Sequence, residues 1–201
     1  MLCEYGAAVK RLSGAAPEKA PWMSRRHGRR EGELTISMYQ ASVPVFSAML
    51  KALDHVLAKA ERHAAETGAD LGELFAARLA PDMLPLKVQV LIACDHAKGA
   101  CCRLAGRDIP SFPDNEADFA ELHARIAKTR ELLKTFAEAD IDGSEEREIV
   151  VTLRQGEMRF PGMQYLLHYA MPNFYFHVTT AYDILRSRGV PLGKADFFGR
   201  G

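Results

Sequence analysis

From Thr35 onward, apolar residues recur at every third or fourth position, which is the spacing of one face of an α-helix. In the first such segment the apolar stripe comprises Val43, Phe46, Leu50, Leu53 and Leu57. Pro44 is tolerated only in a first helical turn, so this helix should begin near Ser42, and Gly68 should end it. A short helical turn and a proline-punctuated connector should follow, over residues 71–86.

Three further segments have helical spacing. Residues 87–106 predict a second long helix that ends at Gly106, and residues 115–140 predict a third. A fourth helical pattern covers residues 162–189, with a kink expected at Pro172 because proline has no N–H to donate. Four long helices joined by short connectors favour an all-α fold, a four-helix bundle.

The segment between the third and fourth helices has a different pattern. Residues 147–153, "REIVVTL", are rich in β-branched side chains, and a glycine-containing turn separates them from "EMRF". This combination predicts a small β-hairpin inserted before the last helix.

Composition limits the number of domains and the kinds of partner. With 201 residues, of which 48% are hydrophobic, the chain can bury one substantial core, and residues 34–201 are predicted to form that single domain. The 26 basic and 26 acidic residues cancel, so no overall field attracts nucleic acid or an anionic membrane. No stretch approaches the roughly 20 apolar residues of a membrane-spanning helix. A cytoplasmic protein without nucleic-acid or membrane partners is therefore expected.

The first 33 residues differ from the rest of the chain. They mix proline, glycine, serine and arginine without periodicity, and they carry seven Lys/Arg against four Asp/Glu. The pattern predicts a disordered extension or a non-native one, with translation starting at the Leu34 codon. Mass spectrometry of the endogenous N-terminus would decide between them, because a peptide from residues 10–30 is incompatible with a start at Leu34.

The last helical segment contains the first candidate for chemistry. Asn173 and His177 are four residues apart, so both can reach one point inside a bundle. His168 can join them only if the chain turns it inward at Pro172. His177 could be a metal ligand or a catalytic base, or it could be a buried histidine that only holds helices together by a hydrogen bond. The residues leave both interpretations open.

Asp95, on the second predicted helix, is the other candidate. A buried carboxylate requires a partner. Lys98, three residues on, is the simple choice, and His177 across the bundle is the alternative that would orient an imidazole or complete a metal site. His96 is rotated by about 100° from Asp95 and is expected at the periphery. The remaining histidines of the helical segments, His55, His63 and His123, are expected on the surface.

Other residue types narrow the function further. Tyrosine hydroxyls could line a cavity. Four cysteines, Cys3, Cys94, Cys101 and Cys102, have no zinc-site spacing and are expected as free thiols, three of them packed on one helix. The sequence lacks GxSxG, HExxH, P-loop and GxGxxG motifs, so serine hydrolase, zincin and dinucleotide chemistry have no support.

Three stretches resemble a known family. They are "TISMYQASVPVF", "ARLAPDMLPLKVQVLIACDHAKGA" and "YLLHYAMPNFYFHVTTAYDILRSRGVPLGKADFFG". They resemble the uncharacterised bacterial family called domain of unknown function 1993, over about residues 35–199. Its members open with Met before "TIS", where this chain has Leu34. The family looks like a branch of the DinB/YfiT-like superfamily, which implies an up-down-down-up four-helix bundle and a homodimer.

The resemblance also implies a site. Many relatives bind a divalent metal through three histidines, one on the second helix and two spaced by four on the last. In this chain His177 occupies the second paired position, Asn173 the first, and Asp95 lies near the second-helix position with His96 beside it. The implied metal ligands are therefore Asp95, Asn173 and His177, with His168 and His96 as alternates.

Three functions follow from this altered set of ligands. The site could hold a weakly bound, oxygen-preferring divalent metal in a transferase or hydrolase. The same cavity could instead bind a small molecule without turnover. A structural dimer without metal is the third expectation.

Overall fold

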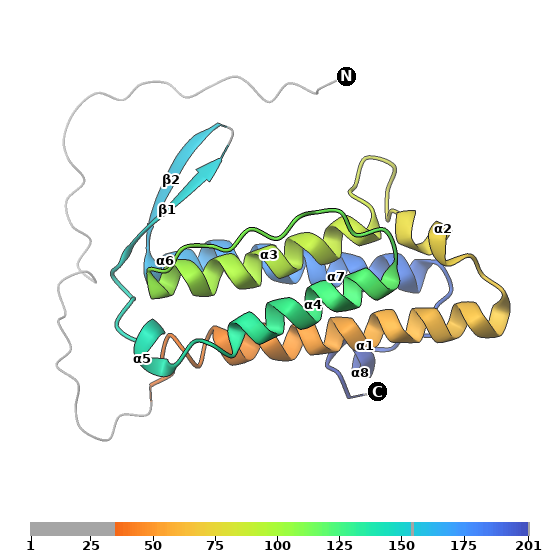
Figure 1. Cartoon of the computed structure of the whole chain (residues 1–201), viewed down its shortest axis with the longest axis horizontal. Coiled ribbons are helices and arrows are strands. Elements are labelled where there is room, and N and C mark those ends of the chain that lie inside the picture. Colours follow the sequence, from red (N-terminus) through yellow and green to blue (C-terminus); the bar gives the residue numbers. More distant parts are fainter. Residues whose placement is uncertain (1–34, 154, 201) are drawn as a thin grey trace. The chain divides into compact units, whose positions relative to one another are not determined.

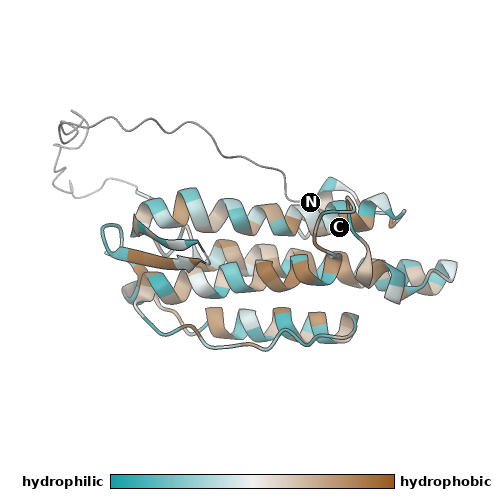
Figure 2. Ribbon diagram, turned by 90° about the horizontal axis from the view of Figure 1, so that it is seen from above, coloured by the Kyte–Doolittle hydropathy of each residue, from teal (hydrophilic) through white to brown (hydrophobic). Residues whose placement is uncertain are grey.

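Most of the chain that the structure describes is helical (Figure 1). The computed structural model describes residues 35–153 and 155–200, so the predicted extension, residues 1–33, lies outside the described residues. Long helices pack side by side in Figures 1 and 2: α1 (Val43–Thr67), α3 (Leu86–Ala105), α4 (Phe119–Leu133) and α7 (Met171–Ser187). Helix α3 packs against α4 and α7, and α1 packs against all three.

Short elements lie between these helices and, in the case of α8, after the last of them. They are α2 (Leu71–Ala76), α5 (Glu138–Ile141), β1 (Glu148–Leu153), β2 (Gly156–Pro161), α6 (Gly162–Tyr165), a π-helical turn (Leu166–Ala170) and α8 (Lys194–Phe197). None of the helices in the described part of the chain combines the length and the apolar character needed to cross a membrane.

The ends of α1 and α3 lie where the sequence predicts them. Pro44 sits in the first turn of α1, where its missing N–H is not needed. Gly68 ends α1 with φ 76° and Gly106 ends α3 with φ 65°, a left-handed conformation that glycine adopts without strain. Helix α2 and the connector after it are also confirmed.

Helix α4 is shorter than residues 115–140, and this prediction was wrong. The Asp118 side chain accepts a hydrogen bond from the backbone N–H of Glu121 at 2.9 Å and so fixes the helix start at Phe119. At the other end the Thr135 hydroxyl donates to the carbonyl of Leu132 at 2.8 Å, a local bond that competes with helix continuation. The chain then turns before forming α5.

The predicted hairpin is confirmed. Strands β1 and β2 pair antiparallel from Glu148 opposite Pro161 to Leu153 opposite Gly156. Ile149 and Val151 are buried on one face of β1. A side chain at Gly162 would collide with the carbonyl oxygen of Ser144, because a Cβ there would lie only 2.0 Å from that atom. This close approach brings the connector between α5 and β1 against the start of the last helical segment.

The last helical segment contains a π-helical turn that periodicity does not predict. The N–H of Met171 bonds to the carbonyl of Leu166, five residues back, and Pro172 follows in the first turn of α7. The π-helical turn ends at Ala170, and Pro172 is therefore in the first turn of α7. An N–H at that position would have no partner within the helix, so its absence in proline costs nothing.

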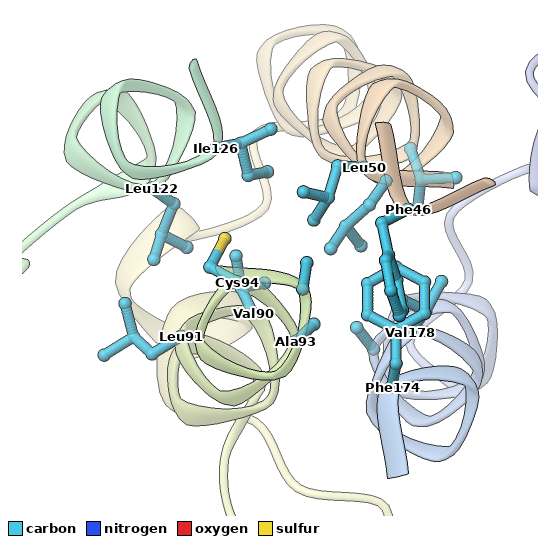
Figure 3. Close-up of a cluster of buried hydrophobic side chains, with 14 of the residues drawn as sticks. Phe46, Leu50, Val90, Leu91, Ala93, Cys94, Leu122, Ile126, Phe174 and Val178 are labelled. Carbon is cyan, nitrogen blue, oxygen red and sulfur yellow. The ribbon is translucent and has the colours of Figure 1, made fainter. Parts of the chain in front are cut away.

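The core lies between the long helices. Figure 2 shows hydrophobic and hydrophilic residues alternating along them, as amphipathic stripes require. The predicted apolar stripe of α1 is buried, and the Phe46 ring meets Phe174 of α7 edge to face at 4.9 Å (Figure 3). Cys94, Cys101 and Cys102 are buried free thiols, as predicted.

Candidate functional site

His177 on α7 is oriented by a buried glutamine of α3. Its Nδ1 lies 2.7 Å from Oε1 of Gln89, whose residue surface is only 1% exposed. The Nε2 of Gln89 donates to the carbonyl of Leu84 at 2.9 Å, so the amide oxygen must be the atom that faces the ring. An amide oxygen only accepts, and His177 therefore carries its proton on Nδ1 and its lone pair on Nε2.

His96 of α3 lies directly beside His177. The two imidazole rings are almost parallel, 17° apart, with centroids separated by 5.8 Å, and Tyr169 approaches His96 at 6.1 Å. The prediction of a peripheral His96 was wrong, because the rotation of about 100° from Asp95 turns it toward α7, against which α3 packs.

Both imidazoles are neutral at pH 7. Burial lowers the pKa of His177 below its usual 6.5. Burial also lowers the pKa of His96, to about 4, with smaller contributions from His177 and the positive charge of Arg103, opposed by Asp95. Neutral imidazole is the form that binds a metal ion or accepts a proton.

The predicted ligands Asp95 and Asn173 each have a different partner. Asp95 Oδ1 lies 2.9 Å from Nζ of Lys98, the simpler of the two expected partners, and 3.0 Å from Nη2 of Arg125 on α4. Asn173 donates from Nδ2 to the carbonyl of Tyr169 at 2.7 Å.

The alternate ligand His168 is exposed and is not turned inward at Pro172. Within residues 35–153 and 155–200, no cluster of three or more His, Cys, Asp or Glu side chains is arranged to hold a metal ion. Of the predicted ligands and alternates, His96 and His177 have rings that lie side by side.

A cavity of about 230 Å³ opens beside His96, between α3, strand β1 and the π-helical turn. Its polar groups come from Asp95, His96, Arg103, Thr152 and Tyr169. A larger hollow of about 620 Å³ lies at the connector after α2, beside Arg188, but no histidine lines it. The hollow beside His96 therefore adjoins the histidine pair through His96.

Sequence reasoning missed Gln89 and Arg103, although their spacing contained a signal. Gln89, His96 and Arg103 follow one another at intervals of seven residues. Two helical turns span about seven residues, so all three lie on one face of α3. This seven-residue polar spacing is the signal in the sequence that groups Gln89 and Arg103 with His96.

The fold and the site define a helical domain with a hairpin before its last helix and two adjacent histidines between α3 and α7. A solved structure described as a DinB family member protein from Shewanella denitrificans, determined by crystallography at 1.83 Å resolution, is similar to this chain. The two share 41% sequence identity and a TM-score of 0.74, over 80% of this chain and 91% of the other.

The family described as domain of unknown function 1993 matches residues 38–198. The chain belongs to this family and is related to DinB-like proteins, which confirms the resemblance stated from the sequence. No curated protein matches the chain.

Proposed function

We propose that the chain is a DinB-type four-helix bundle, with up-down-down-up topology, whose polar interhelical site binds a divalent transition-metal cation through His96 of α3 and His177 of α7. The observation that carries the proposal is the hydrogen bond from His177 to Gln89, which leaves the Nε2 lone pair available. A histidine whose second nitrogen is fixed by a hydrogen bond is the usual arrangement of a metal ligand.

The donor set fits a borderline metal better than a hard one. Zinc, nickel and copper accept imidazole nitrogen, whereas magnesium and calcium prefer oxygen. Zinc–nitrogen bonds are about 2.0–2.1 Å long. The ring centroids are 5.8 Å apart, so one cation is bound by both imidazoles when their nitrogens turn toward a common point. A bound cation would supply Lewis-acid polarisation of an oxygen atom of a bound molecule.

Asp95 and Asn173 have a lesser part in this proposal than in the sequence prediction. Asp95 can offer only its second oxygen, since Oδ1 is shared by Lys98 and Arg125. Asn173 is held through its amide nitrogen and can offer only its carbonyl oxygen. Both are proposed as weak additional ligands, which is consistent with a degenerate site. The homodimer and the cytoplasmic location stay predictions.

Calorimetric titration of Zn²⁺ and Ni²⁺ into the full chain, stripped with EDTA and dialysed, tests the proposal. We expect one site per chain, with affinity at least tenfold weaker in both His96→Ala and His177→Ala. The exposed His168→Ala is the matched control and should bind as the parent does. Gln89→Leu should also weaken binding, by about 10–100-fold. A parent protein that takes up neither metal, or His177→Ala binding unchanged, would refute the proposal.

A second candidate function is the binding of a small molecule without metal or turnover. The cavity beside His96 favours it, because Ile92 and Leu153 give that cavity apolar walls next to its polar groups. A ligand that binds the folded protein would raise the melting temperature in EDTA without being consumed. Consumption of the ligand would contradict this function.

A further inference from the structure

Two neighbouring residues, Gly99 and Tyr165, hold the guanidinium group of Arg103 on α3. The side chain folds back over Gly99, one turn earlier, and a Cβ at Gly99 would come within 2.6 Å of Nη1 of Arg103. The same Nη1 donates to the hydroxyl of Tyr165 at 3.1 Å, and the guanidinium carbon lies 5.8 Å from the centre of that ring. Gly99 and Tyr165 together fix the position of the charge beside the cavity.

The positive charge of Arg103 has no carboxylate partner among the residues that the structure describes. Other cations of the described chain pair with acids: Arg125 with Asp95, and Arg107 with Asp140. The hydroxyl of Tyr165 accepts one hydrogen bond from Arg103 but supplies no negative charge. A half-buried guanidinium has five N–H donors, so most of its donors remain available to a bound molecule.

The cavity walls around Arg103 have two kinds of surface. Thr152 of β1 and the ring of Tyr169 contribute polar groups, while Ile92 and Leu153 are apolar. At about 230 Å³ the cavity is smaller than the roughly 300–1,000 Å³ of drug-sized pockets. The occupant is therefore a compact molecule with one apolar part.

We propose that this cavity binds a small organic acid whose carboxylate pairs with Arg103 and whose apolar part lies against Ile92 and Leu153. A planar carboxylate matches the two parallel N–H groups of a guanidinium. Asp95 also lines the cavity, but its Oδ1 is bound by Lys98 and by Arg125, so its charge opposes a bound carboxylate less than that of a free aspartate would. Arg125 is shared with Asp114 and Glu116, so this compensation is partial. The inference deepens the second candidate function, the binding of a small molecule in the cavity beside His96, and rests on it.

Calorimetric titration of the full chain with benzoate and with its neutral isostere benzamide tests the inference. Both are run in EDTA, so that carboxylate binding is measured separately from metal binding. We expect benzoate to bind and benzamide to bind at least tenfold more weakly. Arg103→Met, which keeps much of the side-chain volume, should weaken benzoate binding at least tenfold, and Gly99→Ala should also weaken it by displacing the guanidinium. The exposed Arg62→Gln is the control and should bind as the parent does.

Three outcomes would overturn the inference. One is equal binding of benzoate and benzamide, another is benzoate binding that Arg103→Met leaves unchanged, and the third is no binding of benzoate or butyrate at millimolar concentration. Inorganic phosphate is titrated in parallel, and binding of phosphate without either carboxylate would also refute the assigned ligand class. A parent protein that binds benzoate in EDTA but takes up no Zn²⁺ or Ni²⁺ would refute the metal proposal and leave this inference standing.

Discussion

The imidazole of His123 on α4 bonds to Asp54 of α1, with Nδ1 2.6 Å from Oδ1, and its Nε2 lies 3.0 Å from Oε2 of Glu61, about two turns further along α1. Both ring nitrogens face carboxylates, so the protonated ring links the two helices best. The polar helix that carries His123 predicts a position on the surface, but the side chain is half-buried. The hydrogen bond to Asp54 is the largest of the causes that raise the pKa of His123.

This arrangement predicts a pH-dependent stability. Because the folded pKa of His123 exceeds the unfolded value of about 6.5, the stabilisation is complete below the unfolded pKa and is lost as the pH rises through the folded pKa. The parent protein should lose unfolding free energy between pH 6 and pH 9, and His123→Gln should lose about 0.5–1 kcal/mol less. The difference is small because both carboxylates are partly exposed. Urea unfolding at the two pH values measures it, with His63→Gln as control. An identical pH dependence in His123→Gln and the parent would contradict the prediction.

The docking of α8 depends on Asp196. Its carboxylate lies 2.8 Å from Nζ of Lys59 and 3.2 Å from Nε2 of His55, and it also accepts the backbone N–H of Gly193 at 2.7 Å. The hydrogen bond from Lys59, first among these, lowers the pKa of Asp196 to about 2. The stabilisation is therefore present above the unfolded pKa of about 4 and is lost as the pH falls toward 2.

Asp196→Asn should lower the unfolding free energy at pH 7 by about 1–2 kcal/mol, with a smaller effect at pH 3. Chemical denaturation at both values measures this, and hydrogen exchange over residues 194–197 locates it. Asp183→Asn, a partly exposed aspartate of α7, is the control. Equal destabilisation at pH 7 and pH 3 would show that charge plays no part.

The three buried cysteines should be unreactive in the folded protein. Burial raises the pKa of the Cys94 thiol to about 12 and raises those of Cys101 and Cys102 as well. Only the thiolate attacks an alkylating reagent, so iodoacetamide at pH 8 should modify these residues far more slowly in buffer than in urea. Peptide mass spectrometry measures the modification at each site. Rapid labelling of Cys94 in buffer would contradict its burial.

Gly162 should tolerate no side chain. A Cβ there would lie 2.0 Å from the carbonyl oxygen of Ser144, so Gly162→Ala must displace the hairpin or α6. We expect a loss of about 1–3 kcal/mol in unfolding free energy, which is typical of overpacking. Gly193→Ala is the matched control, because its nearest foreign atom, in Asp196, would be 3.9 Å away. Equal thermal stability of Gly162→Ala and the parent would contradict the close approach.

Helix positions and the hairpin could be predicted from sequence because each depends on local periodicity and on punctuation by glycine or proline. Gly68 and Gly106 end helices as expected for that reason. The excess length assigned to α4 arose because Asp118 and Thr135 act through side-chain hydrogen bonds, which an apolar stripe does not encode.

The site was less predictable because its contacts cross between helices. The sequence placed His177 correctly on a helix that faces α3, but it gave no means of choosing among the polar residues of α3 that could meet it. The rotation of α3 about its own axis determines which of its polar residues meet His177. It presents Gln89 and His96 to α7, while Asp95 pairs with Arg125.

The π-helical turn sets the rotational phase of the last helical segment. In an uninterrupted α-helix, Tyr165 and His177, twelve residues apart, would point about 120° away from each other. Each hydrogen bond of a π turn spans one more residue than in an α-helix, which removes about one residue of rotation and leaves the two side chains about 20° apart. Tyr165 can then meet Arg103 while His177 meets Gln89. Deleting one residue other than Tyr169 from Leu166–Ala170 would therefore rotate Tyr165 by about 100° relative to His177, so that Arg103 would lose the hydroxyl of Tyr165 while His177 kept its bond to Gln89.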